Sequence, residues 1–169
     1  MQLMHYIEQG GVIMYILLFL NIVGFTTMII KFVQFLLARG RVEALAEGIY
    51  AQLDVGDPEA RQILGREMVT ERMVEFEKGL STVRIIASIA PLLGLLGTVI
   101  GVLSAFNAIS RLGLGDPSVF AGGISLALIT TVGGLVVAIP HYIGYNYLIS
   151  MLDKIEARLA TRLSRKIFA

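Results

Sequence analysis

The sequence predicts an all-α integral membrane protein with three transmembrane helices. Its 169 residues are 56% hydrophobic, above the roughly 45–50% of soluble domains, and the mean hydropathy is +0.76. The charged residues fall mainly in two blocks, which leaves long apolar runs between them. Because a helix needs about 20 apolar residues to cross a hydrocarbon core roughly 30 Å thick, these runs are predicted spans.

The predicted spans are residues 12–37, 83–109 and 119–149. The tail 1–11 carries no Lys or Arg and the loop 110–118 carries one, whereas the other thirteen lie between 31 and 84 or after 153. Since basic segments stay in the cytoplasm, we expect the N-terminus outside and the C-terminus inside. The tail lacks the basic region of a secretory signal, so the first span is expected to be retained. Lys31, near the end of that span, is expected to extend its ammonium to the headgroups.

The polar segments 38–82 and 150–169 are predicted to be helical and cytoplasmic. Residues 54–58 contain Gly56 and Pro58 and are expected to form a turn between two helices of a hairpin. Apolar residues recur with helical spacing on both sides of this turn and in the C-terminal segment. They are Val42, Leu45, Ala46 and Ile49, then Ile63, Met68, Val69, Met73, Phe76 and Leu80, then Ile155, Leu159, Leu163 and Ile167. The third span is therefore expected to continue without a break into 150–169.

Small residues form a stripe along each of the second and third spans. They are Ala87, Gly94, Gly97 and Gly101 in the second, and Gly123, Ala127, Gly134 and Ala138 in the third. Lipid provides no hydrophobic drive for helix association, so such stripes favour close backbone packing. Two stripes exceed what a three-span monomer is expected to bury. We infer a homo-oligomer with spans two and three inside and span one facing lipid; the alternative is that glycine is simply common in membrane helices.

Three hydroxyls lie at mid-depth in the second and third spans: Thr98, Thr130 and Thr131. A hydroxyl in hydrocarbon costs a few kcal/mol unless it is hydrogen-bonded. Two interpretations remain open. Each hydroxyl bonds a carbonyl of its own helix, or the three threonines line an ion pathway in which Thr98 and Thr131 face one another as a polar belt for water or an ion.

Pro91 and Pro140 are expected near the cytoplasmic ends of spans two and three, at similar depth, either as packing kinks or as flex points of a moving assembly. His141 lies among interfacial tyrosines and is interpreted as a packing residue rather than a ligand. Catalytic and phosphate-binding motifs are lacking, and the chain contains no cysteine. We therefore expect no enzymatic activity, no metal, no cofactor and no nucleic-acid partner.

Segment 90–101 reads APLLGLLGTVIG, and the region 122–146 begins GGIS, contains Thr131, Gly134 and Ala138, and ends near IPHYIGYN. These motifs closely resemble the two pore helices of the ExbB/TolQ/MotA family, nearest to ExbB and TolQ. The resemblance implies a pentameric inner-membrane ring around single-span partner helices like ExbD or TolR, possessing an essential aspartate beside Thr98 and Thr131. It also implies coupling of ion flow to mechanical work, with a TonB- or TolA-like protein as a further candidate partner.

One position departs from the ExbB and TolQ pattern. Those proteins usually have a glutamate in the third span where this chain has Leu126, and MotA-type subunits also lack it. Any titrating group in mid-membrane is therefore expected from the partner. The ion is H⁺ or Na⁺, with H⁺ the commoner case in ExbB-like proteins. The alternatives to a motor subunit are a self-contained channel, disfavoured by Leu126, and a scaffold ring without conduction; an intramembrane enzyme is least favoured.

Overall fold

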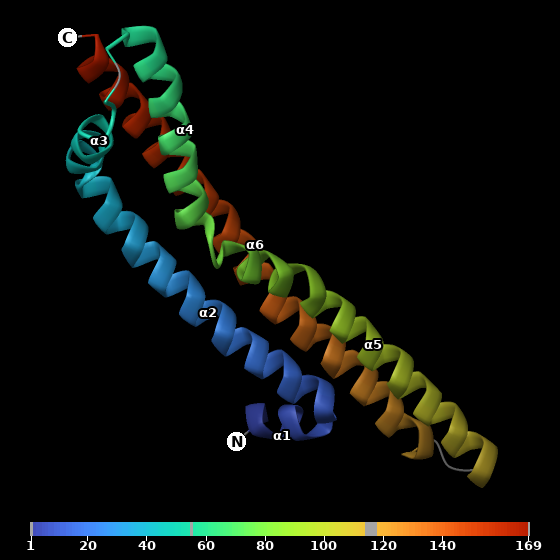
Figure 1. Cartoon of the computed structure of the whole chain (residues 1–169). Coiled ribbons are helices and arrows are strands. Elements are labelled where there is room, and N and C mark those ends of the chain that lie inside the picture. The colour runs from blue at the N-terminus through green and yellow to red at the C-terminus, as the bar shows by residue number, and fades with distance from the viewer. Residues whose placement is uncertain (1, 55, 114–117, 169) are drawn as a thin grey trace. The chain divides into compact units, whose positions relative to one another are not determined.

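The computed structural model describes residues 2–54, 56–113 and 118–168, and the elements in these ranges are helices (Figure 1). They are α1 (Gln2–Gln9), α2 (Gly11–Gly40), α3 (Val42–Tyr50), α4 (Pro58–Glu77), α5 (Leu80–Leu112) and α6 (Ser118–Ile167). Within the described ranges, α2, α5 and α6 are long and apolar enough to cross a membrane. The predicted all-α class with three apolar helices is thereby confirmed.

Helix α6 is a single element of 50 residues that includes both the predicted third span and most of 150–169. At 1.5 Å per residue it is about 75 Å long, more than twice the thickness of a hydrocarbon core. The length of α6 therefore exceeds what a single crossing of the hydrocarbon core requires. The predicted loop 110–118 separates α5 from α6, and its residues Gly115, Asp116 and Pro117 lie outside the described part of the chain.

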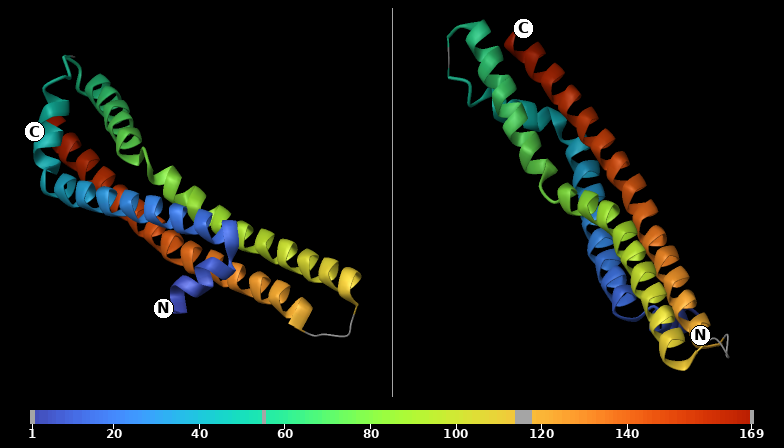
Figure 2. Two further views of the ribbon diagram at one scale, coloured as in Figure 1. Left: turned by 90° about the horizontal axis from the view of Figure 1, so that it is seen from below. Right: turned by 90° about the vertical axis from the view of Figure 1, so that its right-hand side faces the viewer.

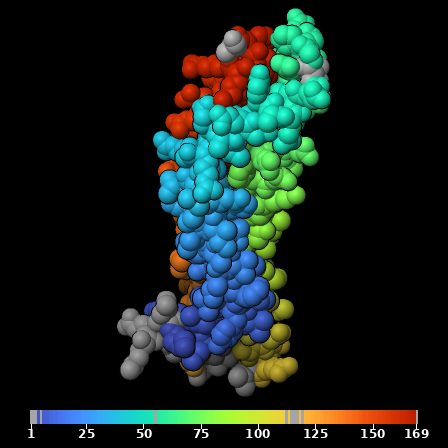
Figure 3. Space-filling model, turned by 60° about the vertical axis from the view of Figure 1, so that its left-hand side comes forward, coloured from blue at the N-terminus to red at the C-terminus, as the bar shows by residue number. Residues whose placement is uncertain are grey.

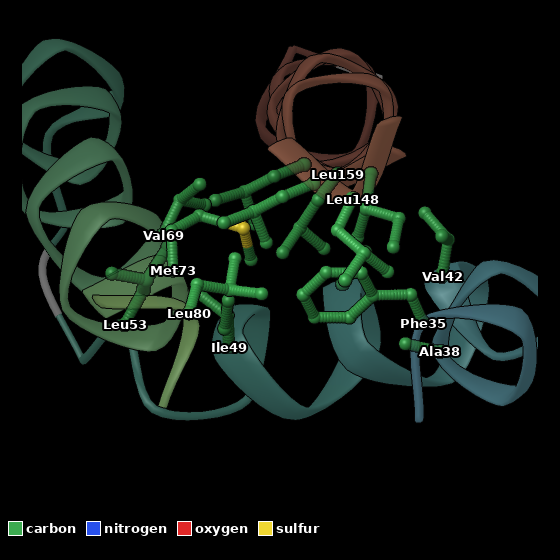
Figure 4. Packing of buried hydrophobic residues seen from close by; sticks show 14 of the residues in the cluster. Phe35, Ala38, Val42, Ile49, Leu53, Val69, Met73, Leu80, Leu148 and Leu159 are labelled. Carbon is green, nitrogen blue, oxygen red and sulfur yellow. The ribbon is translucent and has the colours of Figure 1, made fainter. Parts of the chain in front are cut away.

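The chain divides into two compact units, residues 1–26 with 82–143 and residues 27–81 with 144–169. The second unit has a continuous apolar core. Phe35 of α2, Leu80 of α5 and Leu159 of α6 are fully buried there, and Figure 4 shows the core side chains pointing toward one another from α2, α3, α4 and α6. The polar segment 38–82 thus packs on the ends of the apolar helices and has no separate core.

Helices α3 and α4 form the hairpin of this second unit, and their surfaces meet in the space-filling view (Figure 3). Asp57 caps α4 by accepting a hydrogen bond from the Ala60 N–H at 3.1 Å, and Pro58 occupies the first helical position, as favoured at helix starts. The buried face of α4 contains Val69 and Met73 as predicted. The prediction was wrong for Ile63, whose side chain is 63% exposed.

Lys31, which the sequence predicts to reach the headgroups, makes two hydrogen bonds within the protein. Its ammonium donates hydrogen bonds to Gln34 Oε1 and to the backbone carbonyl of Phe76, both at 3.0 Å. Phe76 lies in the last turn of α4, where carbonyls lack partners within the helix. The next connection contains Gly79 at φ +90°, a conformation that favours glycine, and a Cβ there would lie 3.3 Å from Lys31 Cε. Lys31 therefore fixes the end of α4 where the chain turns into α5.

In the first unit, α5 and α6 run antiparallel and side by side, which all ribbon views show (Figure 2). Their backbones are nearly in contact. A Cβ added to Gly101 would lie 2.5 Å from the Gly123 carbonyl oxygen, and one added to Gly134 would lie 2.6 Å from the Ala90 carbonyl oxygen. Such distances leave no space for a side chain, so the contact requires glycine.

The two small-residue stripes therefore bury each other within one chain. Gly94 faces the Thr130 and Gly134 backbone, and Gly101 faces Gly123 and Ala127. The sequence argument for a homo-oligomer assumed that a three-span monomer could not bury both stripes, and this assumption was wrong. A case for oligomerisation must instead use the apolar surface that α5 and α6 leave exposed.

Helix α2 packs on the same unit through a second set of contacts. Leu17 is buried in a cluster with Ile86, Ala90 and Val137. A Cβ on Gly133 of α6 would lie 2.7 Å from Met14 Sδ of α2, so a further glycine admits a larger side chain.

Replacing Lys31 with Met should weaken the second unit. Met has an unbranched side chain of similar length to that of Lys, but it cannot donate to the Phe76 carbonyl. The loss of this charged donor should reduce the stability by about 1–3 kcal/mol. The measurement is thermal unfolding of the detergent-solubilised protein. Lys78→Met, which removes a charge next to the same connection, is the control, and equal melting temperatures for the two variants would contradict the capping role.

Gly123→Ala and Gly122→Ala form a matched pair for the α5–α6 contact. The first Cβ would meet backbone at 2.5 Å, whereas the second meets nothing within 4 Å. We expect Gly123→Ala to destabilise the protein by about 1–3 kcal/mol through overpacking, and Gly122→Ala to be neutral or slightly stabilising. Thermal unfolding of both proteins in detergent tests this, and two unchanged melting temperatures would refute the close contact.

Candidate functional site

Thr130 lies inside the α5–α6 contact. Its side chain is completely buried, and its hydroxyl donates to the carbonyls of Leu126 at 2.9 Å and Ala127 at 3.0 Å, both on its own helix. A Cβ on Gly97 would overlap this side chain. Of the two interpretations left open by the sequence, Thr130 follows the first, because its hydroxyl is satisfied within α6 and packed against a glycine of α5.

Thr131 and Thr98 lie at the margin of the same contact and are both partly exposed. The Thr131 hydroxyl reaches across to the Gly94 carbonyl at 3.4 Å, a long hydrogen bond, and the Thr98 hydroxyl donates to the Leu95 carbonyl of its own helix at 2.6 Å. Thr98 follows Gly94 by four residues and shares its face of α5. The two hydroxyls thus line one edge of the α5–α6 pair, and each is bonded to a backbone carbonyl.

The surface around this edge is apolar. Helices α5 and α6 expose large hydrophobic side chains over the length of the first unit, including Leu95 at 59%, Val99 at 59% and Leu128 at 63%. Neither residues 85–110 nor residues 119–140 contain an ionisable side chain. The hydroxyls of Thr98 and Thr131 are therefore polar groups on a broad uncharged face.

The register of the antiparallel pair places the two prolines apart. Because Gly94 lies against Gly134 and Gly101 against Gly123, Pro91 is level with the region of residue 135, and Pro140 with that of residue 86. The prolines are therefore offset by about one and a half turns, not matched in depth as the sequence suggested. Both lie inside continuous helices.

Leu126 occupies the position where the resemblance predicts glutamate. Its side chain is partly buried, and its carbonyl accepts the Thr130 hydroxyl. The local structure thus uses its backbone as a hydrogen-bond acceptor, while its side chain has no capacity to bind a proton.

His141 is the second fully buried polar residue of the described part of the chain, with Thr130. Its Nδ1 lies 2.7 Å from the Val137 carbonyl, so that nitrogen carries the proton in this bond. The ring packs edge to face on Phe25 at 4.9 Å and fills the space left by Gly24 of α2. Nε2 has no partner. The sequence interpretation of a packing histidine agrees with these contacts, although the unpaired Nε2 could not be foreseen.

Comparisons with a family profile and with individual known proteins point to the same family. The profile of the MotA/TolQ/ExbB proton channel family matches residues 37–161. The chain is 43% identical over 96 residues to a putative biopolymer transport protein ExbB homolog of Methanothermobacter thermautotrophicus, covering 56% of this chain and 33% of that protein. It is 37% identical over 95 residues to the biopolymer transport protein exbB1 of Vibrio cholerae, covering 56% and 42%.

A third relative, the biopolymer transport protein ExbB of Aquifex aeolicus, is 37% identical over 106 residues, which cover 63% of this chain and 70% of that protein. The match thus spans less than half the length of the first two relatives and 70% of the third. The family match includes both helices of the glycine contact and the threonines at its edge. The chain therefore belongs to the MotA/TolQ/ExbB proton channel family and is nearest to its ExbB members.

Proposed function

We propose that this chain is the ring-forming subunit of an ion-driven motor in a bacterial inner membrane, with its N-terminus outside and its C-terminus in the cytoplasm. The observation that carries the proposal is the edge formed by Thr98 and Thr131 on a wide, uncharged, exposed face of α5 and α6. Membership of a proton channel family supports the same role. Copies of the chain, five in the proposed assembly, turn this face inward around a central partner.

The partner supplies the titrating group. The α5 and α6 segments of the first unit lack an ionisable side chain in mid-membrane, and Leu126 leaves none at the position where ExbB-like proteins carry glutamate. A single-span partner with an aspartate at the level of Thr98 and Thr131 would complete the path. An ExbD- or TolR-like helix has this chemistry, and the ion would bind between its carboxylate and the two hydroxyls.

The proposed ion is the proton. Both threonine hydroxyls already donate to carbonyls of the chain, so each presents its oxygen lone pairs to the centre. Such acceptors suit a water chain that delivers protons to a carboxylate, and they equally suit Na⁺. The names of the relatives point to biopolymer transport as the energised process; the proposed use here is an envelope process such as TonB-dependent import.

A second candidate function is a scaffold ring without ion conduction. The hydroxyls of Thr98, Thr130 and Thr131 all have carbonyl partners, which is the arrangement expected of structural threonines. A motor and a scaffold differ in whether the hydroxyl oxygens are needed for work.

Thr131→Val removes the hydroxyl and keeps the shape of the side chain. We expect loss of energised function, at least about tenfold, while the assembled ring remains intact. Thr161→Val is the control, because Thr161 also bonds a carbonyl of its own helix but lies near the end of α6. The measurements are complementation of a deletion strain and size-exclusion chromatography. A fully active Thr131→Val protein would favour the scaffold.

Ion flux into proteoliposomes tests the need for a partner. We expect flux only when this chain is reconstituted with its single-span partner, and under an H⁺ rather than a Na⁺ gradient. Flux from the chain alone would identify a self-contained channel. Flux with the partner under a Na⁺ gradient would keep the motor and change its ion.

A further inference from the structure

The second unit contains a basic cavity between the end of α2 and α6. Its volume is about 270 Å³, and its lining includes Arg39 of α2 together with Tyr147, Ser150, Lys154 and Arg158 of α6. Residues 147, 151, 154 and 158 recur at helical spacing and share one face of α6. The cavity thus has three cationic groups, two hydroxyls and a lining without a carboxylate.

One carboxylate lies near these cations, because Glu43 lines an adjoining cavity together with Arg39 and Arg158. Ion pairs among the described residues join Arg72 to Glu75, Arg162 to Glu43, and Lys166 to both Glu43 and Glu47. Glu43 and Glu47 are therefore already paired with Arg162 and Lys166, and the hydrogen bond to Glu47 raises the pKa of Lys166. Arg39, Lys154 and Arg158 take no part in these pairs, so the cavity concentrates positive charge that an anion would neutralise.

The exposed residues of α2 beside the cavity are apolar and are suited to contact lipid acyl chains. Phe32, Leu36 and Arg39 follow one another at i, i+4 and i+7 and share one face of α2, and Phe32 and Leu36 are 42% and 53% exposed. The Phe32 ring lies 6.4 Å from that of Tyr147, between centroids. The surface therefore changes, over about 10 Å along α2, from exposed apolar and aromatic side chains to the cationic cavity.

We propose that this cavity binds the phosphodiester headgroup of an anionic glycerophospholipid. The guanidinium groups of Arg39 and Arg158 hold the phosphate through paired hydrogen bonds, Lys154 adds charge, and the Ser150 and Tyr147 hydroxyls bond the glycerol of the headgroup. The acyl chains lie along Phe32 and Leu36. A soluble phosphate would use the same cations but leave this apolar face without a ligand, so the lipid is the favoured source.

The experiment uses the full chain purified in detergent, with native mass spectrometry to count bound dioleoyl phosphatidylglycerol during a titration. Arg39→Gln/Arg158→Gln is compared with Arg66→Gln/Arg72→Gln, which has the same net charge but changes α4. We expect about 10- to 30-fold weaker lipid binding for the first variant and less than about a twofold change for the second, given the usual contribution of each cation near an anionic headgroup.

Three results would overturn the proposal. These are equal retention of dioleoyl phosphatidylcholine, equal losses in both double variants, and full competition by millimolar glycerol 3-phosphate, which would indicate a site for soluble phosphate. Arg39→Lys/Arg158→Lys keeps the charge and should restore at least a third of the affinity. Because these arginine side chains are exposed, we expect the circular dichroism spectrum of the Gln variant to be unchanged. If the Gln variant nevertheless loses helix, the lipid affinity of Arg39→Lys/Arg158→Lys is compared with that of Arg66→Lys/Arg72→Lys. Both Lys variants keep their charge, so a lower affinity of the first alone would show the loss of the paired hydrogen bonds.

Discussion

The direct contact between the backbones of α5 and α6 is the constraint on which the first unit depends. With Gly101 against Gly123 and Gly94 against Gly134, the helices approach as closely as their main chains allow. This approach buries Thr130, brings Thr131 to the Gly94 carbonyl, and leaves Thr98 on the same edge. The position of each hydroxyl is therefore a consequence of where side chains are missing.

The helical class and the three apolar helices could be predicted because apolar runs of this length have one stable form in lipid. The small-residue stripes were also visible in the sequence, since they repeat with helical spacing. The helix that packs against each stripe could not be predicted. A stripe indicates that some helix approaches closely, but its sequence does not distinguish a helix of the same chain from one of a neighbouring copy, and the interpretation of Gly94 and Gly123 as evidence for oligomers failed for that reason.

Other features required three-dimensional contacts. Lys31 near the end of a span has the sequence context of a snorkelling residue, yet a carbonyl 45 residues away receives its ammonium. The depth of Pro91 and Pro140 depended on register, which apolar periodicity leaves undetermined. The cavity around Arg39 and Arg158 joins residues more than a hundred positions apart, so their shared charge is invisible along the chain even though each lies in a basic stretch.

The absence of intervening side chains between α5 and α6 also limits how the first unit can move. The residues of α6 that contact Gly94, Gly97 and Gly101 fit only where α5 has no side chain. If one helix slid along the other, these α6 residues would collide with the larger side chains that lie between the three glycines. The two helices therefore move together as one rigid body. In an assembly that rotates or rocks, the movement has to occur at the interface between neighbouring helix pairs, or between a helix pair and whatever lies at the centre.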